Sequence, residues 1–260
     1  MPSPRETPDN ETRLQVAERE ADAARREAAA ANARLQAFMH GVSHDLRAPL
    51  RAIDGFAGRI AMELGDQAGG NVGEALGRIR GATARMGSLL EGMVEVARAG
   101  TATLRPGQVD LGMLAEWCLA ELQDAEPQRT LEATIQPGLT VVGDERLLKA
   151  MLAQLLGNAW RFSARRDKVV VSVEGERLED GLLLRIRDEG IGFDPAYAHK
   201  LFEPFQRLHG AEDGAGHGLG LAIAAQVAAR HGGDIHGRAV EGEGATFEVR
   251  LRDLQQKEKA

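Results

Sequence analysis

The sequence predicts a protein of two parts, an N-terminal helical hairpin and a C-terminal α/β sandwich in which helices cover one face of a mixed β-sheet. In about the first hundred positions, apolar residues recur with a helical period that is broken at one glycine-rich stretch. The rest of the chain mixes longer helical segments with short strand-like segments, without the regular spacing of βαβ units. With 260 residues, the chain is long enough for two domains that each bury a core.

The composition is that of a soluble, helix-rich protein. Hydrophobic residues make up 43% of the chain and aromatic residues only 4%, which indicates a core built mainly from alanine and leucine. The formal net charge of -7 argues against general affinity for nucleic acid or an anionic membrane. No segment has the roughly 20 apolar residues of a membrane span, and the N-terminus lacks the apolar core of a signal peptide, so we expect a cytoplasmic location. Cys118 is the single cysteine, which excludes an intrachain disulfide and a cysteine-based zinc site and suits a small apolar helix residue.

A disordered tail is expected at residues 1–10, followed by a coiled-coil helix over residues 11–37. Two sets of apolar residues recur every seven positions and form one seam flanked by Glu and Arg: Leu14, Ala17, Ala21, Ala24, Ala28, Ala31, Leu35 and Phe38. A single solvated, alanine-rich helix is the alternative that helix propensity allows. Two registers in phase over about four heptads favour self-association, so we expect a homodimer.

A hairpin of two helices is expected over residues 38–99. The first helix continues to about Leu64, and Pro49 should kink or strain it because proline lacks an N–H and clashes with the preceding turn. The glycine-rich stretch 65–71 ends this helix, and a second helix with one apolar stripe runs from about Val72 to Ala99. Two such hairpins would form a four-helix bundle in the dimer.

The α/β sandwich is expected over residues 110–252, after a linker at 100–109 and before a polar tail at 253–260. Helices are predicted at Leu111–Leu122, Glu145–Phe162 and Leu219–His231. Strands are predicted at Leu131–Ile135, Lys168–Glu174, Leu182–Asp188 and Thr246–Leu251.

A histidine stands beside an acid in the hairpin segment Ser43–Leu50. His44 and Asp45 lie within the first helix just before Pro49, a position that can present a reactive imidazole to solvent. Most surface His–Asp pairs have no catalytic role. The interpretation of this pair as catalytic is therefore supported only by the patterns in the second half of the chain that indicate a nucleotide site. The reference pKa of imidazole is about 6.5, so this ring would be mostly neutral and nucleophilic at neutral pH.

Two polar side chains share one face of the predicted helix Glu145–Phe162. Asn158 and Arg161 are three residues apart. An amide oxygen suits Mg²⁺ and a guanidinium suits phosphate oxygens. A capping asparagine and a solvated arginine near a helix end would give the same pattern, so the pair alone does not decide between the two interpretations.

A carboxylate ends the predicted strand Leu182–Asp188. Gly190 and Gly192 follow Asp188, and their missing side chains allow the backbone to approach a ligand closely. A carboxylate in this position can accept a hydrogen bond from the amino group of adenine. A plain strand-to-loop turn is the alternative.

Four glycines lie in the loop 214–220, directly before the last predicted helix. Backbone N–H groups at a helix N-terminus bind anions, so a polyphosphate is the expected ligand of Gly216, Gly218, Leu219 and Gly220. His217, in the same loop, could contact phosphate, but we expect it to be a solvent-facing residue of a lid.

In their order and spacing, these segments resemble the dimeric sensor histidine kinases of two-component signalling, and the resemblance covers about residues 30–252. The segments similar to the H, N, G1, F and G2 boxes of that family are Ser43–Leu50, Leu155–Phe162, Asp188–Gly192, Leu201–Phe205 and Gly214–Leu221. Each match is modest alone, whereas five in the correct order are specific. The amino-acid sequence of residues 202–209 is also similar to that of phytochrome-like kinases.

The resemblance implies a Bergerat-type ATP-binding fold and the activity of a protein histidine kinase. ATP would bind in the C-terminal domain, where Asp188 hydrogen-bonds to adenine, Asn158 coordinates Mg²⁺ and Arg161 neutralises phosphate charge. His44 would attack the γ-phosphate while Asp45 accepts the other ring proton and orients the ring. The phosphoryl group would then pass to an aspartate in the receiver domain of a separate response regulator. A separate sensor module would supply the signal.

Two positions depart from the family pattern. The fourth residue after the histidine is often Thr or Asn, which is thought to position water for dephosphorylating the regulator, and here it is Ala48. Alanine has no hydrogen-bonding side chain, so weak phosphatase activity is expected. Gln154 stands where the N box often begins with another Asn, and its longer side chain puts a direct role in Mg²⁺ binding in doubt.

Two other classes of function fit parts of the sequence. A non-catalytic signalling scaffold would dimerise and bind partners, but the intact Asn158, Asp188 and glycine loop argue against it. An ATPase that shares the nucleotide fold, as in type II topoisomerases, would leave the helical hairpin and His44 unexplained. Transfer of label from ATP to the protein separates these alternatives from a kinase.

Overall fold

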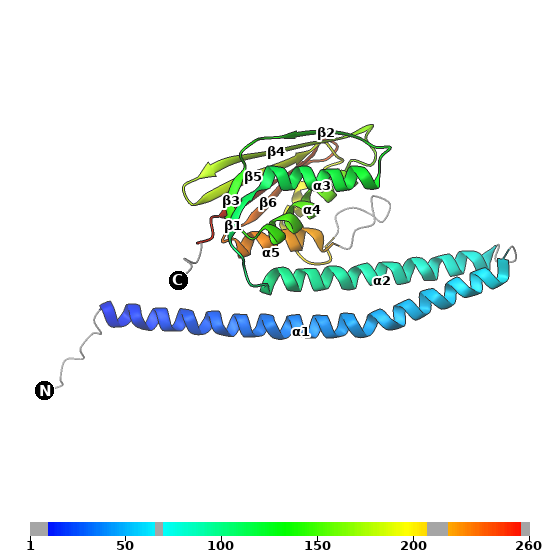
Figure 1. The fold of residues 1–260 in the computed structure, drawn as a ribbon, viewed down its shortest axis with the longest axis horizontal. Helices are drawn as coiled ribbons and strands as arrows, with labels where there is room; N and C mark the ends of the chain where they lie inside the picture. Colours follow the sequence, from blue (N-terminus) through cyan, green and yellow to red (C-terminus); the bar gives the residue numbers. More distant parts are fainter. Residues whose placement is uncertain (1–9, 66–69, 207–217, 256–260) are drawn as a thin grey trace.

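The computed structural model describes residues 10–65, 70–206 and 218–255, and it has two parts, a long helical hairpin and an α/β domain packed on it (Figure 1). Helices α1 (Asn10–Leu64) and α2 (Asn71–Thr101) run antiparallel and pack against each other. Buried α2 residues recur at helical spacing along the hairpin: Leu76, Thr83, Leu90 and Val94. Ile79 and Met86, which belong to the same predicted stripe, are exposed in the single chain.

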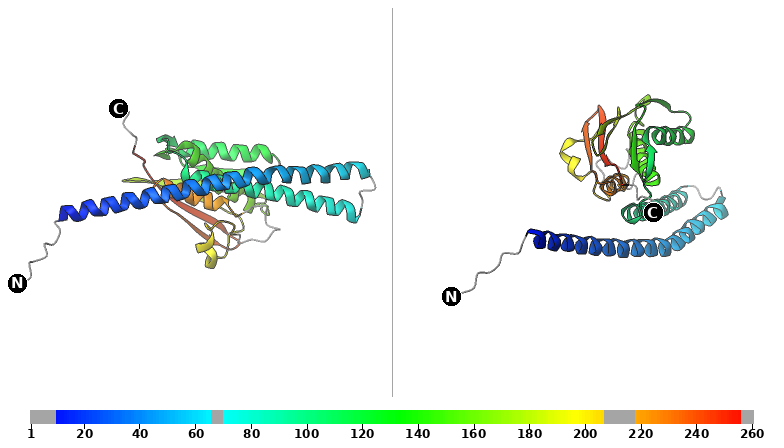
Figure 2. Two further views of the ribbon diagram at one scale, coloured as in Figure 1. Left: turned by 90° about the horizontal axis from the view of Figure 1, so that it is seen from below. Right: turned by 60° about the vertical axis from the view of Figure 1, so that its left-hand side comes forward.

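Helix α1 is continuous across Pro49 and bends in its C-terminal part toward α2 (Figures 1 and 2). Proline has no N–H, so the carbonyl group of Asp45, four residues earlier, lacks its helical donor. The bend agrees with the disturbance expected from a proline inside this helix.

The predicted coiled-coil segment 11–37 lies within α1 and is helical. Most side chains of its seam lie outside the described residues, while Ala31 and Phe38 are described and are exposed. Self-association therefore stays a prediction. No helix within the described ranges is long and apolar enough to cross a membrane.

The elements of the α/β domain are, in chain order, β1 (Gly107–Asp110), α3 (Leu111–Ala125), β2 (Thr130–Ile135), β3 (Thr140–Gly143), α4 (Glu145–Phe162), β4 (Lys168–Leu178), β5 (Gly181–Asp188), the 3₁₀ helix η2 (Pro195–Lys200), α5 (Gly220–Arg230), β6 (Ile235–Val240) and β7 (Gly244–Arg252). Five strands form a sheet in the order β2-β4-β5-β7-β6. Strand β2 pairs parallel with β4, and the other neighbours are antiparallel. The sheet is therefore mixed, as the sequence predicted, and β1 and β3 form a separate antiparallel pair.

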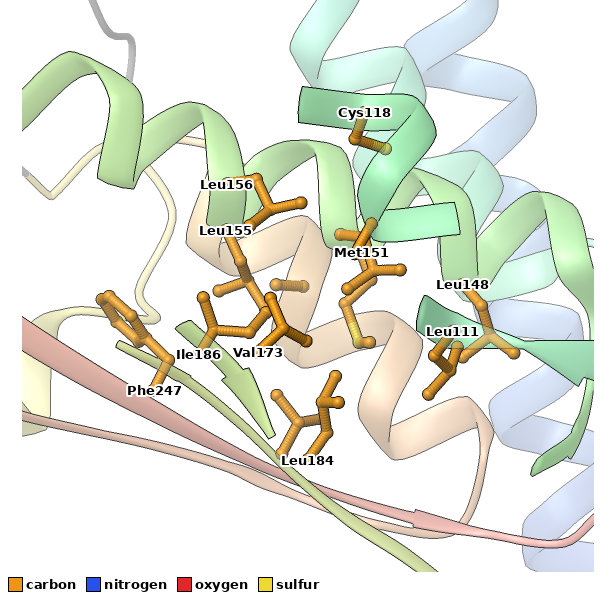
Figure 3. Packing of buried hydrophobic residues seen from close by; sticks show 14 of the residues in the cluster. Leu111, Cys118, Leu148, Met151, Leu155, Leu156, Val173, Leu184, Ile186 and Phe247 are labelled. Carbon is orange, nitrogen blue, oxygen red and sulfur yellow. The ribbon is translucent and has the colours of Figure 1, made fainter. Parts of the chain in front are cut away.

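Helices α3, α4 and α5 lie on one side of the sheet, and the core fills the space between these two layers (Figure 1). Figure 3 shows Met151 and Leu155 of α4 pointing toward Leu184 and Ile186 of β5, with Phe247 of β7 beside them. The α4 and β5 members of this group are at most 1% exposed. Burial of one such side chain contributes about 1.5–3 kcal/mol, so the contact between α4 and β5 is a main source of stability in this domain.

The other face of the sheet carries ion pairs between neighbouring strands. Arg185 of β5 lies 3.2 Å from Glu248 of β7 and 3.3 Å from Glu176 of β4. Lys168 of β4 lies 2.6 Å from Glu132 of β2. Exposed pairs contribute at most about 1 kcal/mol each, so the apolar side of the sheet determines the two-layer arrangement.

The predicted helices are confirmed, and several strands differ from the prediction. Helix α4 has the predicted bounds because the Asp144 side chain caps its first turn, accepting hydrogen bonds from the N–H groups of Arg146 and Leu147. Strands β4 and β7 extend beyond the predicted ranges, and β1, β3 and β6 were not predicted. Strands β1 and β3 have only four residues each, and β6 is half exposed and contains Gly237, so none of them shows a strand pattern.

Candidate functional site

The turn of α1 around His44 faces α2 on one side and solvent on the other. Ser43 is buried, and its Oγ lies 3.5 Å from the carbonyl oxygen of Leu90 on α2. The next residue on a helix points about 100° away, so His44 is directed outward and its side chain is 78% exposed. The imidazole is therefore accessible to a reactant from solvent.

His44 forms a pair with Asp45 as the sequence suggested. The Nδ1 atom of the imidazole lies 3.1 Å from Oδ1 of Asp45, which is also exposed. A carboxylate only accepts hydrogen bonds, so this contact requires the proton to be on Nδ1. The lone pair of the neutral ring is then on Nε2, the atom that points away from the pair.

Asn158 and Arg161 face each other on the last turns of α4. Asn158 is buried, and its Oδ1 accepts a hydrogen bond of 3.1 Å from Nη1 of Arg161. The shared helix face predicted from their spacing is therefore present. One turn earlier on α4, Gln154 contacts the start of α5, because a Cβ atom on Gly220 would lie 2.5 Å from Oε1 of Gln154. This contact was not predicted, and it joins the N-box segment to the end of the glycine loop.

Asp188 occupies a buried position at the end of β5. The residue is 4% exposed, and its Oδ1 accepts hydrogen bonds from the N–H of Gly190 at 2.9 Å and of Ala245 at 3.3 Å. No described residue hydrogen-bonds its Oδ2. Burial raises the pKa of Asp188 above its ordinary value, although the two backbone hydrogen bonds favour the carboxylate and offset part of that effect.

The glycines after Asp188 are held against two neighbouring elements. The N–H of Ile191 donates to the carbonyl oxygen of Phe162 at 3.1 Å, which joins this turn to the end of α4. A Cβ atom on Gly190 would lie 2.9 Å from that same oxygen, and one on Gly192, whose φ is +64°, would lie 2.1 Å from the carbonyl oxygen of Val240. The two glycines therefore let the turn approach the protein's own backbone closely, and the predicted approach to a ligand stays a prediction.

Arg166 makes a further link around the same turn. Its Nη2 donates to the carbonyl oxygen of Gly190 at 3.0 Å and also to the carbonyl oxygen of Gly242 in the β6–β7 turn. The end of α4, the turn after Asp188 and the β6–β7 turn therefore form one connected group. Nothing in the sequence around Arg166 indicated this contact.

The described end of the glycine loop contacts the segment around Phe205 and leads into α5. Gly216 and His217 lie outside the described residues, whereas Gly218 has a φ of +68° and its carbonyl oxygen accepts a hydrogen bond of 2.8 Å from the N–H of Phe205. Phe205 itself has a φ of 67°, which strains a non-glycine residue. Leu219 follows as the buried N-cap residue of α5.

The structure thus brings those predicted nucleotide-binding residues that it describes to one end of α4 and the strands beside it, while His44 lies apart on α1. Figures 1 and 2 show α2 lying between α1 and the α/β domain. The only described polar partner of His44 is Asp45.

Comparison with known families assigns both parts of the chain. Residues 34–102 match the His Kinase A (phospho-acceptor) domain, and residues 143–255 match the histidine kinase-, DNA gyrase B- and HSP90-like ATPase. The chain belongs to the sensor histidine kinases. The first match covers the hairpin that a plain ATPase would leave unexplained.

Relatives of this histidine kinase include cyanobacterial phytochrome A of a Nostoc species, which is 29% identical over 83% of this chain and 28% of the relative. The methanogenesis regulatory histidine kinase FilI of Methanothrix harundinacea is 30% identical over 84% of this chain and 24% of the relative. The crystal structure of full-length ShkA in complex with AMPPNP superposes with a TM-score of 0.59 at 25% identity, covering 85% of this chain and 47% of that one. The chain spans about a quarter of the length of these two curated relatives.

Proposed function

We propose that this chain uses ATP to phosphorylate His44 and then passes the phosphoryl group to an aspartate in the receiver domain of a separate response regulator. The observation that carries the proposal is the exposed imidazole of His44, whose Nδ1 is held by Asp45 and whose Nε2 has no hydrogen-bond partner among the described residues. In the transfer, Nε2 forms a bond to the γ-phosphorus, the bond between that phosphorus and the bridging oxygen breaks, and ADP leaves. The Nδ1 proton stays in its hydrogen bond to Asp45.

Asp188 supports ATP as the substrate. Its Oδ1 is satisfied by two backbone N–H groups, and no described residue pairs with its Oδ2. A buried carboxylate oxygen of this kind is suited to accept a hydrogen bond from the amino group of adenine, because a donor there lowers the cost of keeping the charge buried. Gly190 and Gly192 fix the turn that orients this carboxylate.

Asn158 and Arg161 suit the triphosphate end of the same substrate. The oxygen of the Asn158 side chain is a suitable ligand for Mg²⁺, and the charged Arg161 beside it suits phosphate oxygens. Mg²⁺ bound with ATP would neutralise charge on the phosphates during transfer. The backbone N–H groups of Gly216, Gly218, Leu219 and Gly220, in the sequence that leads into α5, are proposed to bind the phosphates.

A homodimer is the proposed assembly, because the hairpin leaves apolar side chains uncovered. Seven of the exposed apolar residues described on α1 and α2 recur at helical spacing: Leu46, Ile53, Phe56, Ile60, Val72, Ile79 and Met86. A row of this kind in a helical pair is suited to a second copy of the hairpin, which would give a four-helix bundle. We place the sensor module outside this chain.

Incubation with γ-labelled ATP tests the proposed activity. Label on the wild-type protein should be stable in alkali and lost in acid, as expected of a phosphorylated imidazole. Release of phosphate without labelled protein would instead favour a plain ATPase, and neither labelled protein nor released phosphate would favour a scaffold. Either of these results contradicts the proposal.

Replacing Ala48 with threonine is expected to create phosphatase activity toward the phosphorylated regulator. Ala48 is exposed one helical turn after His44, so a hydroxyl group there would lie beside the acceptor histidine and could position water. The rate of phosphate release from a phosphorylated receiver domain should rise about tenfold or more over a near-background wild-type rate. Ala52, exposed one further turn along, provides the matched control. Fast wild-type release, or an equal rise in Ala52→Thr, would show that this position does not limit phosphatase activity.

A further inference from the structure

The α/β domain is attached to the hairpin along one face of α2. A Cβ atom on Gly92 would lie 2.7 Å from Cδ1 of Leu219, and one on Gly100 would lie 3.3 Å from Nε2 of Gln226. Between these glycines, Ala99 is buried within the hydrophobic core of the α/β domain. The two glycines thus let α5 lie directly against α2, with the start of α5 near Gly92 and its end near Gly100.

Arg230, the last residue of α5, holds the C-terminal end of α2. Its guanidinium donates to the carbonyl oxygens of Ala99, Gly100 and Ala102. The last carbonyl groups of a helix lack helical donors and carry the negative end of the helix dipole, so a cation from another element suits this position. Arg230 therefore caps a helix that belongs to the other part of the molecule.

The linker that follows α2 is held from the same domain by Asp144 and Arg146. Oδ2 of Asp144 accepts a hydrogen bond of 2.8 Å from the N–H of Arg105, and Nη2 of Arg146 lies 2.9 Å from that same oxygen and 3.5 Å from the carbonyl oxygen of Thr103. The side chain of Asp144 is almost completely buried.

His231 joins the two ends of this arrangement. It follows Arg230 directly, and its buried Nε2 accepts a hydrogen bond of 3.1 Å from the N–H of Asp144. Its Nδ1 donates to the carbonyl oxygen of Val227 at 2.8 Å, which fixes the neutral ring in one orientation. We call the side chains of Asp144, Arg146, Arg230 and His231 the linker clasp.

The clasp holds the α/β domain on a face of α2 that points away from His44. Successive residues of a helix are about 100° apart, so Gly92 and Ala99 lie roughly opposite Leu90 and Ile79. Leu90 is buried toward α1, and Ile79 belongs to the exposed apolar row. Figures 1 and 2 agree, because α2 separates α1 from the α/β domain. A nucleotide bound near the start of α5 therefore faces neither its own His44 nor that of a second copy packed on the apolar row.

We propose that the linker clasp is a restraint on autophosphorylation, in which Arg230 keeps the nucleotide domain on the outer face of α2 until the last turn of that helix is disturbed. The inference rests on the proposed kinase function. Hydrogen bonds from a charged group change the equilibrium between a bound and a released domain by about tenfold or more. Without those of Arg230, the population in which the α/β domain is released from α2 should therefore rise about tenfold. Arg230 lies at the opposite end of α5 from the glycine loop, about 15 Å along the helix, so ATP binding should not change.

The test compares Arg230→Gln with Arg238→Gln, which removes an exposed arginine paired with Glu248 on the sheet. We expect the initial rate of His44 labelling to rise about tenfold in Arg230→Gln, with the KM for ATP unchanged and no change in the control. Hydrogen exchange of residues 99–106 should accelerate in Arg230→Gln, while exchange of residues 182–188 in β5 should stay slow, which shows that the domain remains folded.

A second pair of variants disturbs the other end of the contact. Leucine at Gly92 would clash with Leu219, whereas at Gly81, three turns earlier on the same face of α2, an added Cβ atom meets only the end of the Arg85 side chain at 3.4 Å. Gly92→Leu should therefore raise the labelling rate and Gly81→Leu should not. An unchanged or lower rate in both Arg230→Gln and Gly92→Leu, or no change in linker exchange, would overturn the restraint. Absence of label in every protein, wild type included, would contradict the kinase function, while linker exchange would still report whether the clasp forms.

Discussion

Label from γ-labelled ATP is expected to fall to background in the His44→Gln variant, a loss of about a thousandfold or more in the rate of protein phosphorylation. Glutamine has a side chain of similar length and polarity but no nitrogen lone pair that can attack phosphorus. The wild-type side chain is 78% exposed, and its one polar contact among the described residues is with Asp45, so its replacement removes little packing. The variant should therefore keep the melting temperature and the ATP affinity of the wild type.

The chain offers a matched control for this experiment in His236. Its Nε2 lies 3.0 Å from Oδ1 of Asp234, and its side chain is 71% exposed, so its local chemistry is close to that of His44. It lies on β6 of the α/β domain and not on the hairpin. His236→Gln should label at the wild-type rate. A partial loss of label of equal size in both variants would mean that His44 and His236 are phosphorylated without selection, and full label in His44→Gln would place the acceptor elsewhere.

The regular elements of this protein follow from local sequence patterns. Helix α4 has both a capping aspartate at Asp144 and an uninterrupted apolar period, so its bounds could be predicted. The strands β1, β3 and β6 could not be predicted, because their pairing partners lie more than thirty residues away or along an exposed edge, as in the pairing of Val109 with Val141.

Contacts between the two parts of the molecule leave no signal in the sequence. Gly92 and Gly100 only weaken a helix locally, and they allow the approach of α5 because of what lies opposite them in space. Arg230 has the pattern of a solvated cation in the last turn of a helix, yet its guanidinium binds carbonyl groups about 130 residues earlier. Long-range packing decides both positions.

In the candidate site, too, the residue types could be predicted from the sequence, whereas the contacts could not. The residue types at His44, Asn158 and Asp188 could be identified from their order and spacing, and their chemistry suits a kinase. The sequence could not reveal that Asp188 is almost fully buried or that Gln154 contacts Gly220. These features depend on the turn after β5 packing against the end of α4, which no local pattern encodes.

Replacing Asp188 with asparagine is expected to raise the dissociation constant for ATP about a hundredfold while leaving the fold intact. Oδ1 of the new side chain can still accept the hydrogen bonds from Gly190 and Ala245. An amide nitrogen would then stand in the place of Oδ2 and direct a donor toward the amino group of adenine. Losing a hydrogen bond to a carboxylate and burying two opposed donors costs about 3 kcal/mol, which is roughly a hundredfold in affinity. Titration with a fluorescent ATP analogue measures the change, and Asp194→Asn, an exposed cap of η2, is the control.

The same substitution should stabilise the nucleotide-free protein. Burial raises the pKa of Asp188 in the folded state. The protonated side chain therefore contributes fully to the stability of the fold only below the ordinary aspartate pKa of about 4, and this contribution is lost as pH rises through the pKa of the folded state. At pH 7 the buried carboxylate therefore opposes folding, and asparagine removes that cost. Thermal unfolding without nucleotide should give Asp188→Asn a melting temperature at or above that of the wild type at pH 7, with the difference narrowing as pH falls. A variant that is less stable at pH 7 but binds ATP normally would show that this carboxylate supports the fold and not the substrate.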